Sequence, residues 1–116
     1  MTQEQIWGKA LHTWRVGAAE LARLAETVDP AVLARCVEVI AGCRGRIVTS
    51  GAGTSAAAAR KIAHSLSCIE RPAFFLEPAD AVHGALGSAQ PGDVAVFISK
   101  GGGTREIMNE IISRQI

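Results

Sequence analysis

The stretch Arg46-Ile47-Val48-Thr49-Ser50-Gly51-Ala52-Gly53-Thr54-Ser55 decides the fold of this chain. Its first half is a short β-rich run, and its second half is a glycine loop that leads into a helix predicted over residues 56–69. A second unit of the same kind follows, in which a strand over residues 94–99 meets the glycine loop 100–104 and a helix from Arg105. This repeated order of strand, glycine turn and helix predicts an α/β fold with a parallel sheet and right-handed crossovers.

Between these two units the sequence predicts a further strand. It covers residues 73–76 after Pro72, and residues 77–90 are expected to form a loop that allows one helical turn. All the predicted strands are continuous apolar runs, so we expect the sheet to be covered on both faces.

Two helices are predicted ahead of the sheet. This divides the chain into a helical segment, residues 1–44, and an α/β segment, residues 45–116. Asp29-Pro30 separates the helices, with Asp29 as the N-cap and Pro30 as the first residue of the second helix, whose apolar side is expected to be buried. The first helix carries an apolar seam from Trp7 to Val28. The seam fits either an intramolecular core or a coiled-coil interface, and the small area of sheet favours the interface.

Composition excludes several classes of protein. The chain has 116 residues, 48% of them hydrophobic, and a net charge of +1 from twelve Lys and Arg against eleven Asp and Glu. A disordered tail would need fewer apolar residues and a larger net charge. The near-neutral charge and the scattered basic residues give no reason to expect nucleic acid as a partner.

The cysteines and the apolar runs bear on location. The chain has three cysteines, Cys36, Cys43 and Cys68. This odd number without regular spacing favours three buried thiols in a reducing cytoplasm. We find no signal-peptide pattern and no run of about 18 apolar residues, so no membrane association is expected.

Three strands are few for a doubly wound sheet, and the apolar pattern continues to Ile116. We therefore expect the first part of a longer domain, or a sheet completed by another chain.

The two glycine loops predict a site for an anion. Each follows a strand and opens a helix, where backbone amides and the helix dipole favour negative charge. Both loops are expected at the carboxyl edge of the sheet, where open α/β sheets bind ligands. Neither loop has the P-loop pattern, and the dinucleotide pattern is incomplete. Ordinary helix capping by Ser and Thr is the structural alternative.

The α/β segment resembles the sugar isomerase (SIS) domain, in particular the branch that contains arabinose-5-phosphate isomerases. The matching pieces are Gly51-Ala52-Gly53-Thr54-Ser55, Arg60-Lys61-Ile62-Ala63, Pro72-Ala73-Phe74-Phe75, His83-Gly84-Ala85-Leu86-Gly87 and Ile98-Ser99-Lys100-Gly101-Gly102-Gly103-Thr104-Arg105-Glu106. The resemblance implies a flavodoxin-like three-layer sandwich, in this chain an incomplete SIS domain. It also implies a sugar phosphate as ligand and a homo-oligomer, either a dimer or a tetramer.

The resemblance also implies a set of binding residues. The phosphate would be held by the second loop and the sugar or phosphate would be contacted by the first. The substrate-binding residues are therefore expected to be Ser50, Gly51, Gly53, Thr54, Ser55, Ser99, Lys100, Gly101, Gly102, Gly103 and Thr104.

Three positions depart from the isomerase branch. Thr54 stands where the branch usually has Lys, Ala85 where it has Asp, and Gly101 where it has a second Ser. Each change removes a charge or a phosphate ligand, and Lys100 could compensate by bringing a cation to the phosphate. From the resemblance we expect the C-terminal half of the domain, and the tandem CBS domains of many relatives, to lie outside the sequence given.

Aldose–ketose isomerisation needs groups that move protons between neighbouring carbons and oxygens. His83, in a loop beside Gly84, and Glu106, near the start of the last helix, are the candidate catalytic residues. His12 and His64 lie within predicted helices and are interpreted as structural or exposed. No pattern of metal ligands is present, so neither a metal nor another cofactor is expected.

Three hypotheses about function follow. The leading one is a cytoplasmic phosphosugar aldose–ketose isomerase of the SIS type, similar to arabinose-5-phosphate isomerase. The alternative is a non-catalytic phosphosugar-binding or regulatory SIS module, which the changes at Thr54, Ala85 and Gly101 favour. A domain that binds an NAD-type nucleotide is a more modest rival.

Overall fold

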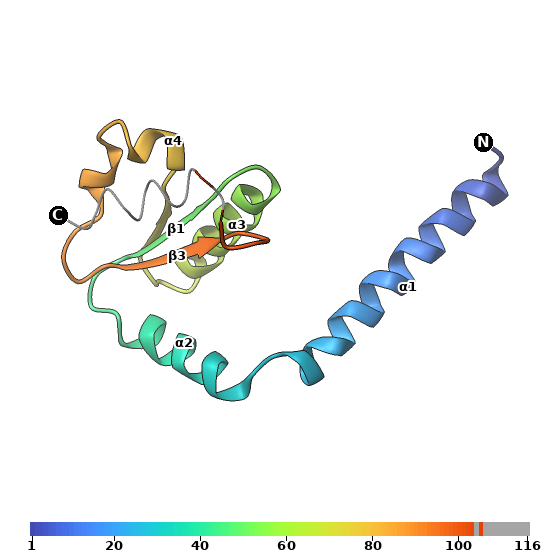
Figure 1. Ribbon diagram of the computed structural model, residues 1–116, viewed down its shortest axis with the longest axis horizontal. Helices are drawn as coiled ribbons and strands as arrows, with labels where there is room; N and C mark the ends of the chain where they lie inside the picture. The colour runs from blue at the N-terminus through green and yellow to red at the C-terminus, as the bar shows by residue number, and fades with distance from the viewer. Residues whose placement is uncertain (104, 106–116) are drawn as a thin grey trace. The chain divides into compact units, whose positions relative to one another are not determined.

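The computed structural model describes residues 1–103 and 105, and its elements run in the order helix, helix, and then alternating strands and helices (Figure 1). Thr104, predicted to bind substrate, and Glu106, predicted to be catalytic, lie outside the described residues. The elements are α1 (Gln3–Thr27), α2 (Pro30–Gly42), β1 (Ile47–Gly51), α3 (Thr54–Cys68), β2 (Ala73–Phe75), α4 (Pro78–Ala81), the 3₁₀ turn η1 (Ala85–Ser88) and β3 (Val94–Ile98). The residues group into two compact units, Met1–Val37 and the chain from Glu38 onward.

The sheet has three described strands in the order β2-β1-β3, and both pairings are parallel. Helix α3 packs against all three strands. Because parallel neighbours require a crossover, the helices return the chain to the same edge after each strand. The predicted α/β class with a parallel sheet is confirmed.

Coverage of the sheet differs from the expectation at one strand. All residues of the central strand β1 are buried, with Ile47 fully inaccessible, as a strand covered on both faces requires. In β3 half-buried and exposed residues alternate, and Phe97 is 37% exposed. Successive side chains of a strand point to opposite faces, so one face of the sheet is less covered at β3.

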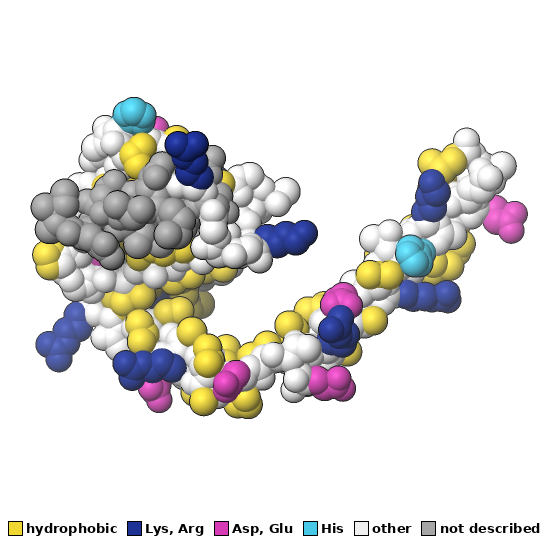
Figure 2. Space-filling view, in the orientation of Figure 1, with side chains coloured by type: hydrophobic (Ala, Val, Ile, Leu, Met, Phe, Trp, Pro, Cys, Tyr) yellow, Lys and Arg dark blue, Asp and Glu magenta, His cyan; other side chains and the backbone are white. Residues whose placement is uncertain are grey.

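The apolar positions of the two N-terminal helices are not buried. Neither α1 nor α2 has a buried residue, so the expected buried side of α2 was wrong. Figure 2 shows hydrophobic side chains along α1, and Trp7 and Trp14 meet there edge to face with 5.7 Å between ring centroids. A single amphipathic helix has no second layer of its own to cover its apolar side. The interface interpretation of the seam stays a prediction.

Local signals set the starts of both helices, and the predicted N-cap at Asp29 is confirmed. The side chain of Thr2 caps α1, and the Asp29 carboxylate accepts hydrogen bonds from the amides of Ala31 and Val32 at the start of α2. Of the three cysteines, which are all free, only Cys43 is buried. Cys36 and Cys68 lie on exposed helix faces, which corrects the expectation of three buried thiols. No helix in the described ranges has the length and apolar character needed to cross a membrane.

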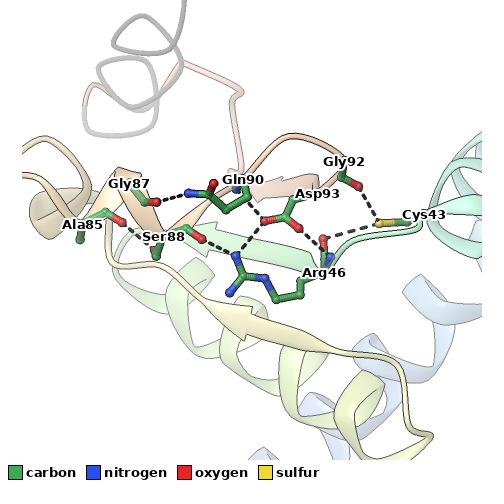
Figure 3. Close-up of polar contacts among 8 residues, drawn as sticks. All are labelled: Cys43, Arg46, Ala85, Gly87, Ser88, Gln90, Gly92 and Asp93. Atoms are coloured by element: carbon green, nitrogen blue, oxygen red, sulfur yellow. Dashed lines mark hydrogen bonds and ion pairs between the residues drawn. The ribbon is translucent and has the colours of Figure 1, made fainter.

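The amino-terminal edge of the sheet is closed by Arg46 and Asp93 (Figure 3). One carboxylate oxygen of Asp93 accepts the Arg46 amide at 2.7 Å, and the other accepts the Arg46 guanidinium at 3.1 Å and the Gln90 amide at 2.8 Å. The Arg46 guanidinium also donates to the carbonyl of Ser88 and lies 4.8 Å from the ring centroid of Phe74. These contacts join the starts of β1, β2 and β3 at the edge opposite the glycine loops.

Asp93→Asn should lower the stability of the fold, by an amount that depends on pH. The amides of Arg46 and Gln90, aided by the Arg46 guanidinium, hold the pKa of Asp93 below its ordinary value of 3.8. A carboxylate with a lowered pKa stabilises the fold above its unfolded pKa, and this stability is lost as pH falls through the folded pKa. Urea unfolding at several pH values should show the variant less stable than wild type near pH 7, with the difference shrinking in acid. An unchanged difference down to acid pH would contradict this role.

Helix α3 ends in a turn that places a non-glycine residue in the left-handed region. Glu70 has φ 59°, its amide donates to the carbonyl of Ser67, and the Arg71 amide donates to the carbonyl of Leu66. This is the hydrogen-bond pattern of a Schellman C-cap, in which glycine is preferred. The turn aims Arg71 at the end of α2, where its guanidinium donates to the carbonyls of Ile40, Ala41 and Cys43.

Glu70→Gly should stabilise the protein. Glycine has no Cβ, so it adopts φ 59° without the steric strain that Glu70 bears. The removal of this strain outweighs the extra conformational entropy of the unfolded chain, so the free energy of unfolding should rise by about 0.5–1 kcal/mol. Thermal or urea unfolding measures it. Glu70→Ala is the matched control, since it removes the same carboxylate but keeps the Cβ, and it should give no such gain.

Candidate functional site

The two glycine loops leave the sheet next to each other. Strands β1 and β3 are hydrogen-bonded neighbours, and their last paired residues are Gly51 and Ile98. The loop at residues 52–53 and the loop at residues 99–103 therefore start at adjacent points of the carboxyl edge. This is the edge at which open α/β sheets bind ligands.

The first loop depends on two glycines. A Cβ on Gly51 would lie 2.9 Å from the backbone of Ser55 and 3.1 Å from the carbonyl oxygen of Ile98, so the turn and β3 leave no room for a side chain. Gly53 is the N-cap of α3 with φ 60° and ψ −129°, a conformation that is essentially restricted to glycine. These two residues bring the backbone and the start of a helix to the edge of the sheet.

Helix α3 begins at Thr54, two residues earlier than predicted, so Thr54 and Ser55 lie in its first turn rather than in a loop. Thr54 is exposed and Ser55 is half-buried. No side chain caps this end of the helix. The first amides of a helix lack partners within it, and together with the helix dipole they favour an anion.

The second loop is ordered by Ser99. Its hydroxyl oxygen accepts a hydrogen bond from the Gly102 amide at 3.0 Å, and Gly102 adopts φ 71°. Lys100 and the three glycines at 101–103 are exposed. The loop thus presents backbone and one lysine side chain beside the start of α3.

Ser50 differs from the other expected binding residues because it is buried. It is 1% exposed, and its hydroxyl donates to the carbonyl of Leu76 at 2.7 Å. The Leu76 amide in turn donates to the carbonyl of Thr49 at 2.8 Å. Ser50 therefore holds the exit of β2 against β1, and a contact between Ser50 and substrate stays a prediction.

His83 lies on the third segment that leaves this edge. Strand β2 is parallel to β1, so the chain after Phe75 also emerges at the carboxyl end of the sheet. It forms α4, whose residue Ala81 is buried in a cluster with Val48 and Leu76. The amide of His83 donates to the carbonyl of Asp80 at 3.0 Å, and the residue is exposed. An exposed imidazole on a helix-supported turn suits general acid–base chemistry.

Arg60 is a residue beside the candidate site that was not predicted from the sequence. Its guanidinium donates to the Glu77 carboxylate at 3.0 Å and lies 4.0 Å from the ring centroid of Phe75. It therefore ties α3 to the start of α4. The signal that could have found it is the motif Arg60-Lys61-Ile62-Ala63, together with the position of Glu77 directly after the predicted strand 73–76.

Within residues 1–103 and 105, no group of three or more His, Cys, Asp or Glu residues is arranged to hold a metal ion. The two loops offer backbone amides, hydroxyls and Lys100, and His83 is exposed on the separate segment that follows β2. Amides and an ammonium group bind phosphate oxygens well. The arrangement suits a small phosphorylated ligand held at the two loops, with an imidazole on the third segment.

Comparison with known proteins identifies the family of this chain. Residues 40–113 match the SIS domain. Arabinose 5-phosphate isomerase GutQ of Escherichia coli K12 is 41% identical over 104 residues, which are 90% of this chain and 32% of the relative. Arabinose 5-phosphate isomerase KpsF of Escherichia coli O6:H1 is 36% identical over 96 residues, which are 83% of this chain and 29% of the relative. The chain thus spans about a third of the length of these curated relatives.

Two solved structures extend the comparison. A candidate sugar-phosphate isomerase from Listeria monocytogenes superimposes with a TM-score of 0.94 at 47% identity, over 97% of this chain and 59% of that one. A protein of Escherichia coli CFT073, solved in complex with a sugar phosphate, superimposes with a TM-score of 0.85 at 30% identity, over 97% of this chain and 60% of that one.

Proposed function

Because this chain belongs to the SIS domain family, we propose that it carries the phosphosugar site of an aldose–ketose isomerase similar to arabinose-5-phosphate isomerase. The observation that carries the proposal is the pair of glycine loops, which the β1–β3 register places side by side at the carboxyl edge. Their exposed amides and the start of α3 are suited to a phosphate dianion.

In this proposal the two loops bind and His83 takes part in catalysis. Residues 99–104 hold the phosphate, and residues 50–55 contact the sugar or phosphate. Isomerisation removes a proton from the carbon beside the carbonyl, forms an enediolate, and returns a proton to the former carbonyl carbon. His83 and Glu106 are the proposed groups for these transfers, since an imidazole or a carboxylate can accept and return a proton.

The wider assignment is also part of the proposal. Residues 1–44 form a helical segment and residues 45–116 the N-terminal part of the phosphosugar-binding domain. We propose a cytoplasmic homo-oligomer, either a dimer or a tetramer. The free thiols support the location, and the uncovered apolar positions of α1 support the oligomer.

A non-catalytic phosphosugar-binding or regulatory module is the second candidate. Thr54, Ala85 and Gly101 favour it, because each replaces a charged or hydroxyl-bearing residue of the isomerase branch. Calorimetry with arabinose 5-phosphate, inorganic phosphate and unphosphorylated arabinose tests binding, and NMR of a panel of aldose and ketose phosphates tests turnover. Binding with turnover supports the isomerase, and binding without turnover supports the module. Equal affinity for the free sugar and its phosphate would contradict both.

Ser99→Ala should weaken binding of the sugar phosphate. The substitution removes the oxygen that accepts the Gly102 amide, so the second loop loses an internal hydrogen bond as well as a phosphate ligand. We expect a loss of affinity of roughly tenfold, equivalent to one or two hydrogen bonds. Titration calorimetry measures it, and Ser88→Ala, in η1, is the control. An unchanged affinity would move the anion site away from this loop.

A further inference from the structure

Arg60 joins three elements that surround the candidate site. It lies on α3, stacks on Phe75 at the end of β2, and forms an ion pair with Glu77, the N-cap residue of α4. The same stretch is held from the other side by Ser50, whose hydroxyl donates to the carbonyl of Leu76. The chain is therefore held at three consecutive residues where it leaves β2, namely Phe75, Leu76 and Glu77.

Backbone hydrogen bonds within residues 77–83 order the segment between Glu77 and His83. Pro78 is fully buried and Ala81 is 3% exposed, so α4 is seated on the core. The Ala81 amide donates to the carbonyl of Glu77 at 2.9 Å, and the His83 amide donates to the carbonyl of Asp80 at 3.0 Å. A four-residue helix cannot maintain its direction by its own hydrogen bonds. Its orientation must come from such anchors.

We propose that Arg60 is a positioning residue, which acts through Glu77 and Phe75 to set the orientation of α4 and thereby the place of His83 in the site. This inference rests on the proposed function of His83. The guanidinium pairs with Glu77, the N-cap residue of α4, and burial of Ala81 anchors the last residue of the helix, so the turn that carries His83 has little freedom to reorient.

The geometry separates positioning from stability. The side chains of Arg60 and Glu77 are 58% and 40% exposed. An ion pair this exposed contributes little to global stability, and the stacked guanidinium adds a modest amount. Loss of the pair should leave the fold intact. It should nevertheless matter for catalysis, because proton transfer depends on placement of the imidazole within fractions of an ångström.

A double-mutant cycle on the full chain tests the kinetic claim with Arg60→Gln, Glu77→Gln and the double variant. Each single change should lower kcat roughly tenfold with little change in KM, and the double variant should be no worse than either single variant because the two residues act as one unit. Lys61→Gln, which removes a neighbouring positive charge from the same helix, is the control and should keep kcat. Additive losses, or a loss confined to KM, would overturn the proposal.

Two readouts do not depend on turnover. Hydrogen exchange of the Ala81 and His83 amides should speed up in Arg60→Gln while the amides of β1 keep their protection. In the NMR spectrum the ring signal of His83 should move, and that of His12 on α1 should not. If the wild type binds and converts no sugar phosphate, the proposed function fails, and these readouts still decide whether Arg60 orients α4. Unchanged exchange and an unmoved His83 signal would show that it does not.

Discussion

His83→Gln is expected to abolish most turnover of sugar phosphate while leaving its binding nearly intact. The glutamine side chain keeps hydrogen-bonding groups but cannot carry a proton between carbon and oxygen. Since general acid–base groups contribute about 10²–10⁴-fold to rate, kcat should fall by that factor. The backbone of the turn should persist, because the His83 amide and not its ring bonds to Asp80. Rate assays with the interconverting sugar phosphates and parallel calorimetry measure the two quantities.

The control for this prediction is His64→Gln. His64 is exposed on α3, where its ring lies 3.5 Å from the sulfur of Cys68. The change removes an imidazole of the same chemistry from a face without a proposed role, so kcat should be retained. If His83→Gln keeps full activity, the proton transfer belongs to another group, and Glu106 becomes the first residue to test.

Gly51→Ala is expected to cost both stability and affinity. The new methyl group would lie 2.9 Å from the backbone of Ser55 and 3.1 Å from the carbonyl oxygen of Ile98. These are backbone atoms of α3 and β3, so neither can move aside as a flexible side chain would. Forcing them apart should destabilise the protein by about 2–3 kcal/mol. It should also separate the two loops and weaken phosphate binding, as unfolding and calorimetric titrations would measure.

Gly87→Ala is the matched control. A Cβ at Gly87 meets no atom within 4 Å, so the same substitution should be close to neutral there. Gly51→Ala with wild-type stability would show that β1 and β3 can separate without penalty. Normal stability combined with weak binding would place the whole effect in the ligand site.

Much of this structure could be read from short-range patterns. The apolar run at Ile47 and Val48 correctly predicts the buried central strand, and the glycine loop after it leads into α3 as expected. Asp29 and Pro30 marked a helix start because capping depends only on residues within one turn. The placement of both glycine loops at one edge followed from the rule that parallel strands end together.

Other features depend on contacts between residues far apart in the chain. Ser50 is buried because it lies on the central strand, and its hydroxyl is satisfied by the distant carbonyl of Leu76. The half-exposed pattern of β3 is set by what covers each face of the sheet. The Arg60–Glu77 pair bridges two elements. The motif Arg60-Lys61-Ile62-Ala63 marks Arg60 in the sequence, but no local pattern shows that it pairs with Glu77.

The sequence by itself determined the α/β class, the order of elements and the segments that carry the candidate site, because periodicity, capping and glycine turns are local properties of the chain. The tertiary structure decided which of those residues are exposed at the carboxyl edge and which are buried in the scaffold. That distinction separates Ser50, whose hydroxyl is bonded to the Leu76 carbonyl, from the exposed second loop, and it reveals the ion pair between Arg60 and Glu77 at the start of the segment that carries His83. The physical reason is that burial and hydrogen-bond partnership are set by residues brought together only when the sheet has formed.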